Sequence, residues 1–222
     1  MYKAGFRHIK LSPHYTVEEV KAAVEEAKTL GIPVTSHGGG GSDTHPPTMT
    51  KLAVEAGVDC IEHLNPMEEE VLDLMVEKGT YNVPTLAIYR EQYKANQIPN
   101  DLIEKRGWKL SVHEELFKKA QARKIVMGIG TDAIYEFMKL YPGLYFTEMK
   151  YFLELGATPM ETLVAATKNG AIILSMEDKL ATIEKGKLAD IQVLTGNPLD
   201  SFDVLGNPEI VIIDGKVHEF TK

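Results

Sequence analysis

The sequence predicts an α/β fold in which parallel strands alternate with helices and curve into a barrel. The main observation is a repeat of about 26 residues: an amphipathic helical stretch, a glycine, and then a short apolar run. Gly31, Gly57 and Gly79 stand at these junctions. A glycine readily adopts the left-handed conformation that ends a helix. Since a helix separates each strand from the next, consecutive strands are expected to run in the same direction.

The elements can be placed along the first 178 residues. A helix is expected over 17–30, because Thr16 and Glu19 form a capping box. Thr158 and Glu161 form a second capping box with Pro159 at the first helical position. The other expected elements are helices near 47–56, 68–78, 146–155 and 158–176, a polar and mostly helical stretch over 91–121, and strands over 32–36, 58–62, 81–88 and 125–130.

The pattern changes after residue 179, where short β-rich segments appear at 190–194, 209–213 and 216–220. Asp214-Gly215 is a typical hairpin turn. A tail of this size is too small to fold alone, so it is expected to pack on something else. We therefore predict a barrel region over 1–178 and C-terminal β-strands over 179–222.

Composition limits the classes of function. The chain has 222 residues, a net charge of −8 and 44% hydrophobic residues. An acidic chain is a poor partner for nucleic acid or an anionic membrane, and neither is expected here. Cys60 is the single cysteine, which excludes an internal disulfide and fits a reducing compartment. No apolar run is long enough to span a bilayer, so we expect a cytoplasmic protein.

Four potential metal ligands stand where apolar runs end: Lys10, His37, His63 and Asp132. The first three follow one another at intervals of 27 and 26 residues, which is one strand and helix each time. The carboxyl ends of barrel strands meet at one face, where active sites form. The imidazoles of His37 and His63 suit zinc and related metals.

Lys10 and Asp132 each have two interpretations. A lysine with a lowered pKa can react with carbon dioxide to form a carbamate, an anionic ligand able to bridge two metals, and nearby positive charge lowers that pKa. Lys10 can equally extend its ammonium group to solvent from a strand end. Asp132 can hold a metal and accept a proton from water, or cap the following segment.

Other polar residues are weaker candidates. His45, Tyr89 and Arg90 follow expected strands and could contact a substrate, with Arg90 suited to a carboxylate. His113 lies among charged residues on an expected helix, where we expect it to be exposed. The glycines over 38–41 lack the lysine of a phosphate-binding loop and are expected to form a flexible loop near the site.

The ordered set of motifs resembles the amidohydrolase superfamily, and most closely its imidazolonepropionase-like and prolidase-like members. The motifs are Ile9-Lys10, Ser36-His37-Gly38, Ile61-Glu62-His63, Gly130-Thr131-Asp132, the segment 165–171, Gly186-Lys187-Leu188-Ala189-Asp190 and Gly196-Asn197-Pro198-Leu199. The resemblance implies a partial TIM (β/α)8 barrel made of strands four to eight, followed by strands of a small sandwich. It also implies that one metal is bound by Lys10, His37 and His63, and that Asp132 binds another and transfers the proton. In many members of the family the lysine at the position of Lys10 is carboxylated.

The implied activity is hydrolysis of amide (C–N) bonds in dipeptides, N-acyl amino acids or cyclic amides, with one or two divalent ions, zinc being the expected metal. The chain departs from the family in one respect: the His-x-His of the first barrel strand occurs nowhere in it. We therefore expect the C-terminal portion of a longer enzyme, inactive alone, or a piece that self-associates. The alternative is a catalytically inactive, truncated barrel acting as a scaffold or assembly partner.

Overall fold

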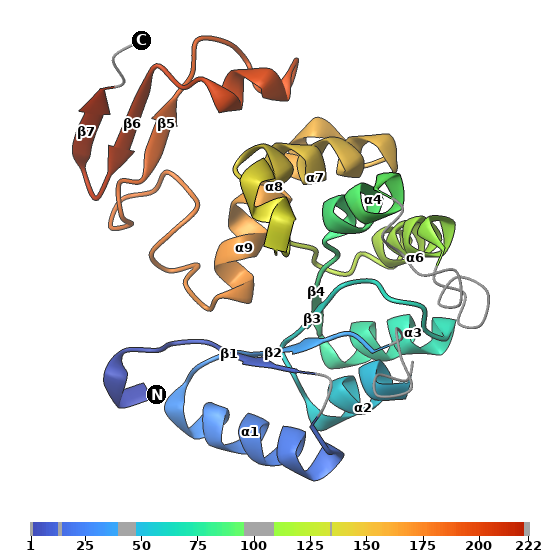
Figure 1. Cartoon of the computed structure of the whole chain (residues 1–222). Coiled ribbons are helices and arrows are strands. Elements are labelled where there is room, and N and C mark those ends of the chain that lie inside the picture. The colour runs from blue at the N-terminus through green and yellow to red at the C-terminus, as the bar shows by residue number, and fades with distance from the viewer. Residues whose placement is uncertain (1, 13–14, 40–47, 96–108, 134, 220–222) are drawn as a thin grey trace.

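The computed structural model describes residues 2–12, 15–39, 48–95, 109–133 and 135–219. Its central element is a parallel sheet in the order β1 (Ile9–Leu11), β2 (Val34–His37), β3 (Cys60–Glu62) and β4 (Tyr81–Val83) (Figure 1). Every neighbouring pair is parallel. The expected α/β fold with parallel strands is therefore confirmed.

A helix follows each of these strands, and further helices come later in the chain. They are α1 (Val17–Leu30), α2 (Thr48–Ala56), α3 (Glu69–Lys78), α4 (Leu86–Lys94), α6 (Leu110–Ala122), α7 (Gly143–Glu154), α8 (Pro159–Ala166) and α9 (Lys168–Ile173). Both expected capping boxes are present, at Thr16 and at Thr158. Gly31 and Gly79 end α1 and α3 with φ values of 63° and 69°. Burial of Val24, Val54 and Leu72 places the apolar faces of α1 to α3 in one core.

Two boundaries differ from the prediction. The expected strand over 81–88 ends at Val83, and Leu86 already begins α4. The extended chain stops because Thr85 adopts a left-handed conformation, with φ 53°. The expected helix over 158–176 is interrupted at Thr167, which separates α8 from α9.

The segment over 125–130 continues the sheet beyond β4, although it forms only an isolated parallel bridge between Asn82 and Met127. The Asn82 N–H donates to the Val126 carbonyl at 3.0 Å, and the Gly128 N–H donates to the Asn82 carbonyl at 2.9 Å. This pairing carries the chain along β4 toward Asp132. Of the strand expected over 125–130, the structure thus forms only a bridge at Met127, which runs parallel to β4 as expected.

Substituting Gly130 by alanine is expected to destabilise the fold, because the added Cβ would lie 2.5 Å from Val83 Cγ1. Overpacking of this kind typically costs about 1–3 kcal/mol. Chemical denaturation of Gly130→Ala measures the effect. Gly143→Ala is the control, because no atom lies within 4 Å of its added Cβ. Equal stability of the two variants would contradict the close approach at Gly130.

A second sheet lies apart from the first (Figure 1). Its antiparallel strands are β5 (Ile191–Val193), β6 (Ile210–Ile213) and β7 (Lys216–Glu219), in that order. Asp214 and Gly215 join β6 to β7 with φ values of 51° and 73°, as a tight hairpin requires. The remaining elements are the 3-10 helices η1 (Tyr2–Ala4), η2 (Tyr135–Leu140) and η3 (Phe202–Gly206). The domain boundary at 178/179 stays a prediction. In the described part of the chain, no helix has the length and apolarity to cross a membrane.

Candidate active site

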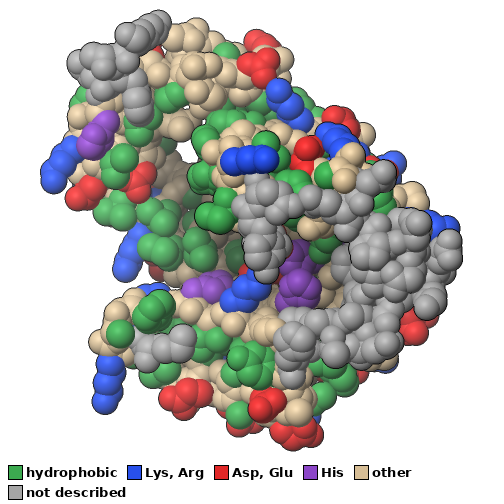
Figure 2. Space-filling model, viewed as in Figure 1, with side chains coloured by type: hydrophobic (Ala, Val, Ile, Leu, Met, Phe, Trp, Pro, Cys, Tyr) green, Lys and Arg blue, Asp and Glu red, His purple; other side chains and the backbone are tan. Residues whose placement is uncertain are grey.

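Three of the predicted site residues come together where parallel strands end. His37 is the last residue of β2, His63 directly follows β3, and Asp132 follows the segment over 125–130. The ring centroids of His37 and His63 are 4.2 Å apart, and His63 Nε2 lies 3.9 Å from Asp132 Oδ2. Figure 2 shows histidine and basic side chains gathered in the hollow that crosses the middle of the molecule.

The backbone is unusual at this cluster. His63 and Asp132 both have positive φ values, of 74° and 46°, which are uncommon for residues with a side chain. Strained backbone of this kind is concentrated at functional sites. Both residues adopt this left-handed conformation directly after an extended segment ends. Their side chains then lie close together, 3.9 Å apart.

His63 is the centre of the cluster. Its side chain is 1% exposed, and its Nδ1 lies 2.6 Å from Thr85 Oγ1. Among the described residues, its buried Nε2 has no hydrogen-bond partner. Burial first, and then the neighbouring His37 and Lys10, hold the pKa of His63 well below its usual range. A neutral ring that donates from Nδ1 to Thr85 presents the lone pair of Nε2 toward Asp132.

Lys10 is paired with a residue that is not among the predicted site residues. Its Nζ forms an ion pair with Glu62, the last residue of β3. Thr35 Oγ1 donates its one hydrogen to the other oxygen of this carboxylate at 2.9 Å. It therefore acts as the acceptor in its second hydrogen bond, from His8 Nε2 at 3.2 Å. Lys10 and Glu62 thus line the same face of the sheet as the histidines. The carboxylated state of Lys10 stays a prediction.

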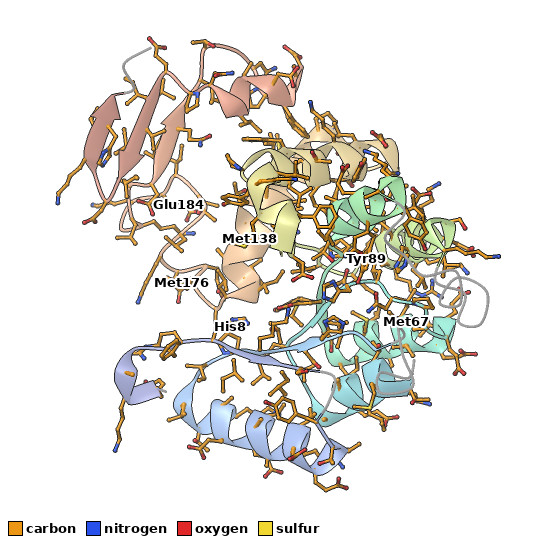
Figure 3. The ribbon with its side chains drawn as sticks, in the orientation of Figure 1. His8, Met67, Tyr89, Met138, Met176 and Glu184 are labelled. Carbon is orange, nitrogen blue, oxygen red and sulfur yellow. The ribbon has the colours of Figure 1, made fainter. Side chains whose placement is uncertain are left out.

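A buried polar network supports Gly38, directly after His37. Asn65 Nδ2 donates to the Gly38 carbonyl at 2.7 Å, and the Tyr89 hydroxyl donates to Asn65 Oδ1 at 2.7 Å. The ring of Tyr89, which is labelled in Figure 3, stacks on His113 with centroids 4.5 Å apart and meets His63 edge-on at 5.8 Å. Tyr89 is buried, so its first role is to hold this network. Its predicted contact with substrate stays a prediction.

The expectation that His113 is exposed is wrong. The side chain is fully buried, and its Nδ1 donates to the Leu64 carbonyl at 2.8 Å. The residue faces inward because it shares one face of α6 with Leu116, Phe117 and Ala120, all of which are buried. Burial lowers the pKa of His113 to about 4, so the ring is neutral.

Arg90 joins three helices. Its Nη2 lies 2.6 Å from Glu114 on α6 and its Nη1 lies 2.5 Å from Glu154 on α7. The guanidinium also lies 3.6 Å from the centroid of the Tyr151 ring. With its donors used in this way, Arg90 has little left for a substrate carboxylate, and the geometry does not support that expectation. His45 lies outside the described residues.

The donors fit a metal only in part. Within the described ranges, no three His, Cys, Asp or Glu side chains come together as a ready ligand set. Even so, a buried imidazole nitrogen without a partner is costly unless something binds it. At His63 Nε2, a cation would satisfy that nitrogen and face the carboxylate of Asp132.

Together, the fold and the cluster define an α/β protein with a histidine and aspartate site at the carboxyl ends of parallel strands. A family model described as "Amidohydrolase family" matches residues 6–218, and the chain belongs to this family. The resemblance inferred from the motifs is thus confirmed.

The chain is similar to curated proteins that are named as enzymes. The chain is 28% identical over 204 residues to ochratoxinase from Aspergillus niger, covering 89% of this chain and 39% of the relative. It is 27% identical over 190 residues to imidazolonepropionase from Symbiobacterium thermophilum, covering 82% of this chain and 38% of the relative. The chain therefore spans about two fifths of these curated relatives.

Solved structures resemble the whole chain. A crystal structure of a Xaa-Pro dipeptidase with bound methionine matches with a TM-score of 0.82 and 34% identity, covering 99% of this chain and 56% of that one. A prolidase complexed with N-methylphosphonate-L-proline matches with a TM-score of 0.83 and 26% identity, again covering 99% and 56%. The agreement covers the second sheet as well as the first.

Proposed function

We propose that this chain provides part of a metal-dependent hydrolase of amide (C–N) bonds. The observation that carries the proposal is the buried Nε2 of His63, which has no hydrogen-bond partner among the described residues and faces Asp132 across 3.9 Å. His37 lies beside it, and the three side chains come from the ends of separate strands. Neutral imidazoles and a carboxylate are ligands that suit a divalent cation such as zinc.

We assign Lys10, His37, His63 and Asp132 to holding one or two divalent ions. The metal supplies Lewis acidity and lowers the pKa of a water molecule. Asp132 accepts the proton of the attacking water and then passes it to the leaving nitrogen, as general base and then general acid. Burial raises the pKa of Asp132, while Lys10 opposes this effect, so the carboxylate is better able to carry a proton between steps than an exposed aspartate.

The proposed substrates are small molecules: dipeptides, N-acyl amino acids or cyclic amides. Relatives named as a Xaa-Pro dipeptidase and as imidazolonepropionase support these classes. We further propose that β1 to β4 and the segment over 125–130 correspond to strands four to eight of a (β/α)8 barrel, and that turnover requires the remaining strands. The hydrolases among the relatives do not favour the scaffold alternative.

Metal binding gives a direct test. The wild-type chain is expected to bind zinc in calorimetric titration, and His63→Asn to bind it at least about 100-fold more weakly. Even removing a residue that hydrogen-bonds to a metal ligand lowers metal affinity by about 10–100-fold. His8→Asn is the control, because His8 lies on the same sheet face but bonds only to Thr35 among the contacts described. Equal affinities of the wild type and His63→Asn would contradict the assignment.

Hydrolysis is then measured on a panel of dipeptides with C-terminal proline, N-acyl amino acids and cyclic amides. The chain is compared with a form extended to a complete barrel, each with zinc and with a chelator. We expect turnover by the complete barrel that the chelator abolishes. Full turnover by the shorter form would contradict the proposed need for the remaining strands, and turnover unaffected by chelation would contradict metal dependence.

A further inference from the structure

The start of α4 is capped by a residue from another helix. The N–H groups of Leu86 and Ala87, in the first turn of α4, donate to the two carboxyl oxygens of Glu148 at 3.0 and 2.5 Å. Glu148 lies on α7, which packs beside α4 (Figure 1), and its side chain is fully buried. A helix start leaves its first N–H groups without partners inside the helix, so this carboxyl group satisfies two of them.

The residue that would normally provide this cap is Thr85. A threonine at this position usually accepts a hydrogen bond from the helix through its side chain. Thr85 makes no such bond, and its backbone is left-handed, with φ 53° and ψ 41°. Its hydroxyl instead lies 2.6 Å from Nδ1 of His63. Because Glu148 caps the helix, the Thr85 hydroxyl is available to the imidazole.

We propose that Glu148 is a positioning residue for His63. By holding the first turn of α4 it fixes Thr85, and Thr85 fixes the tautomer and rotation of the His63 ring, so that Nε2 faces Asp132. The purpose of this orientation rests on the proposed function, whereas the orientation itself is a property of the chain that can be measured without metal. No residue of this relay except His63 belongs to the proposed ligand set.

A second contact between the same helices separates positioning from simple packing. One turn further along α4, Arg90 pairs with Glu154 of α7 and stacks on Tyr151. If α7 only supports α4 by packing, loss of the Arg90 to Glu154 contact should disturb His63 as much as loss of the Glu148 cap. If Glu148 acts through Thr85, only the cap should matter. Glu154→Gln is therefore a matched control for Glu148→Gln.

The test reads the His63 ring in the full metal-free chain by long-range ¹H–¹⁵N NMR, with His63→Asn identifying its signals among the seven histidines. The spectra are recorded at pH 8.5, where the carboxyl of Glu148 is largely ionised. There Glu148→Gln replaces one acceptor oxygen by a donor facing an N–H group, so we expect a changed ratio of the two tautomers. Glu154→Gln should leave the ratio as in the wild type. Thr85→Ser should keep the wild-type ratio, and Thr85→Val should change it.

The relay also predicts that the effects are not additive. Adding Glu148→Gln to Thr85→Val should change the His63 signals no further, because the hydroxyl through which Glu148 acts is already gone. Zinc affinity should fall about 10–100-fold in Glu148→Gln and in Thr85→Val alike, as for loss of a partner of a ligand. If Glu148→Gln does not fold, Glu148→Asp keeps the carboxyl group but shortens its reach, and should change the tautomer ratio in the same direction.

Unchanged His63 signals in a folded Glu148 variant, or additive effects of Glu148→Gln and Thr85→Val, would overturn the proposal. Equal changes in Glu148→Gln and Glu154→Gln would do the same. A wild-type chain that binds no zinc would count against the proposed function alone, because the metal-free NMR measurement still decides the role of Glu148.

Discussion

Replacing Asp132 by asparagine is expected to lower kcat of the complete barrel by about 10²–10⁴-fold, the usual contribution of general acid and base catalysis. Asparagine keeps the shape of the side chain but cannot accept the proton of water at neutral pH. His37 and His63 remain in place, so metal content should fall far less than turnover. Steady-state kinetics with a C-terminal proline dipeptide, together with metal analysis of the same preparations, measures both quantities.

Asp203→Asn provides the control for this substitution. Asp203 is exposed on η3 and pairs with Lys150, outside the strand-end cluster. It should therefore leave both kcat and metal content near the wild-type values. Wild-type turnover in Asp132→Asn would remove Asp132 from the mechanism, whereas equal losses of metal and turnover would assign it to metal binding alone.

Local signals in the sequence were sufficient for most of the fold. The capping boxes at Thr16 and Thr158 and the hairpin at Asp214-Gly215 each depend on neighbours in the chain, and each was predicted correctly. The prediction of a strand over 81–88 was wrong in its second half, because a short apolar run fits a buried strand and a buried helix equally well. What decides between them is the left-handed turn at Thr85, a conformation that threonine rarely adopts.

The site divides in a similar way. His37, His63 and Asp132 could be picked out from the sequence because each stands at the end of an apolar run, and the two histidines are also separated by one strand and helix. Thr85 and Glu148 could not, because their roles arise from contacts over 22 and about 60 residues. His113 could have been predicted correctly: it begins a helical stripe with Leu116, Phe117 and Ala120, a stronger signal than the charged residues next to it.

The free energy of unfolding is expected to fall between pH 6.5 and 8, and Glu148 is the expected cause. Burial raises the pKa of Glu148 to about 8 in the folded chain, against 4.5 ordinarily. Across this window the folded state holds a proton that the unfolded state has already released, so each rise in pH favours unfolding. The loss from Glu148 is about 1.6 kcal/mol over this window, because its carboxyl is half ionised at pH 8, and it levels off above that pH, where both states are ionised.

The lower limit of this window is set by His8, His63 and His113, whose folded pKa values are lowered, that of His113 to about 4, and which have the opposite effect. Below pH 6.5 these histidines become protonated in the unfolded state but stay neutral in the folded state. The free energy of unfolding therefore falls as the pH decreases. The difference in urea unfolding between the wild type and Glu148→Gln at pH 6.5, 7.2 and 8.5 therefore isolates Glu148, because the histidines contribute equally to both. Glu148→Gln should remove the decline, while Glu154→Gln should keep it, since Glu154 is largely exposed. A decline of the same size in Glu148→Gln would place its source in another group and would leave the Glu148 carboxyl ionised in the folded chain.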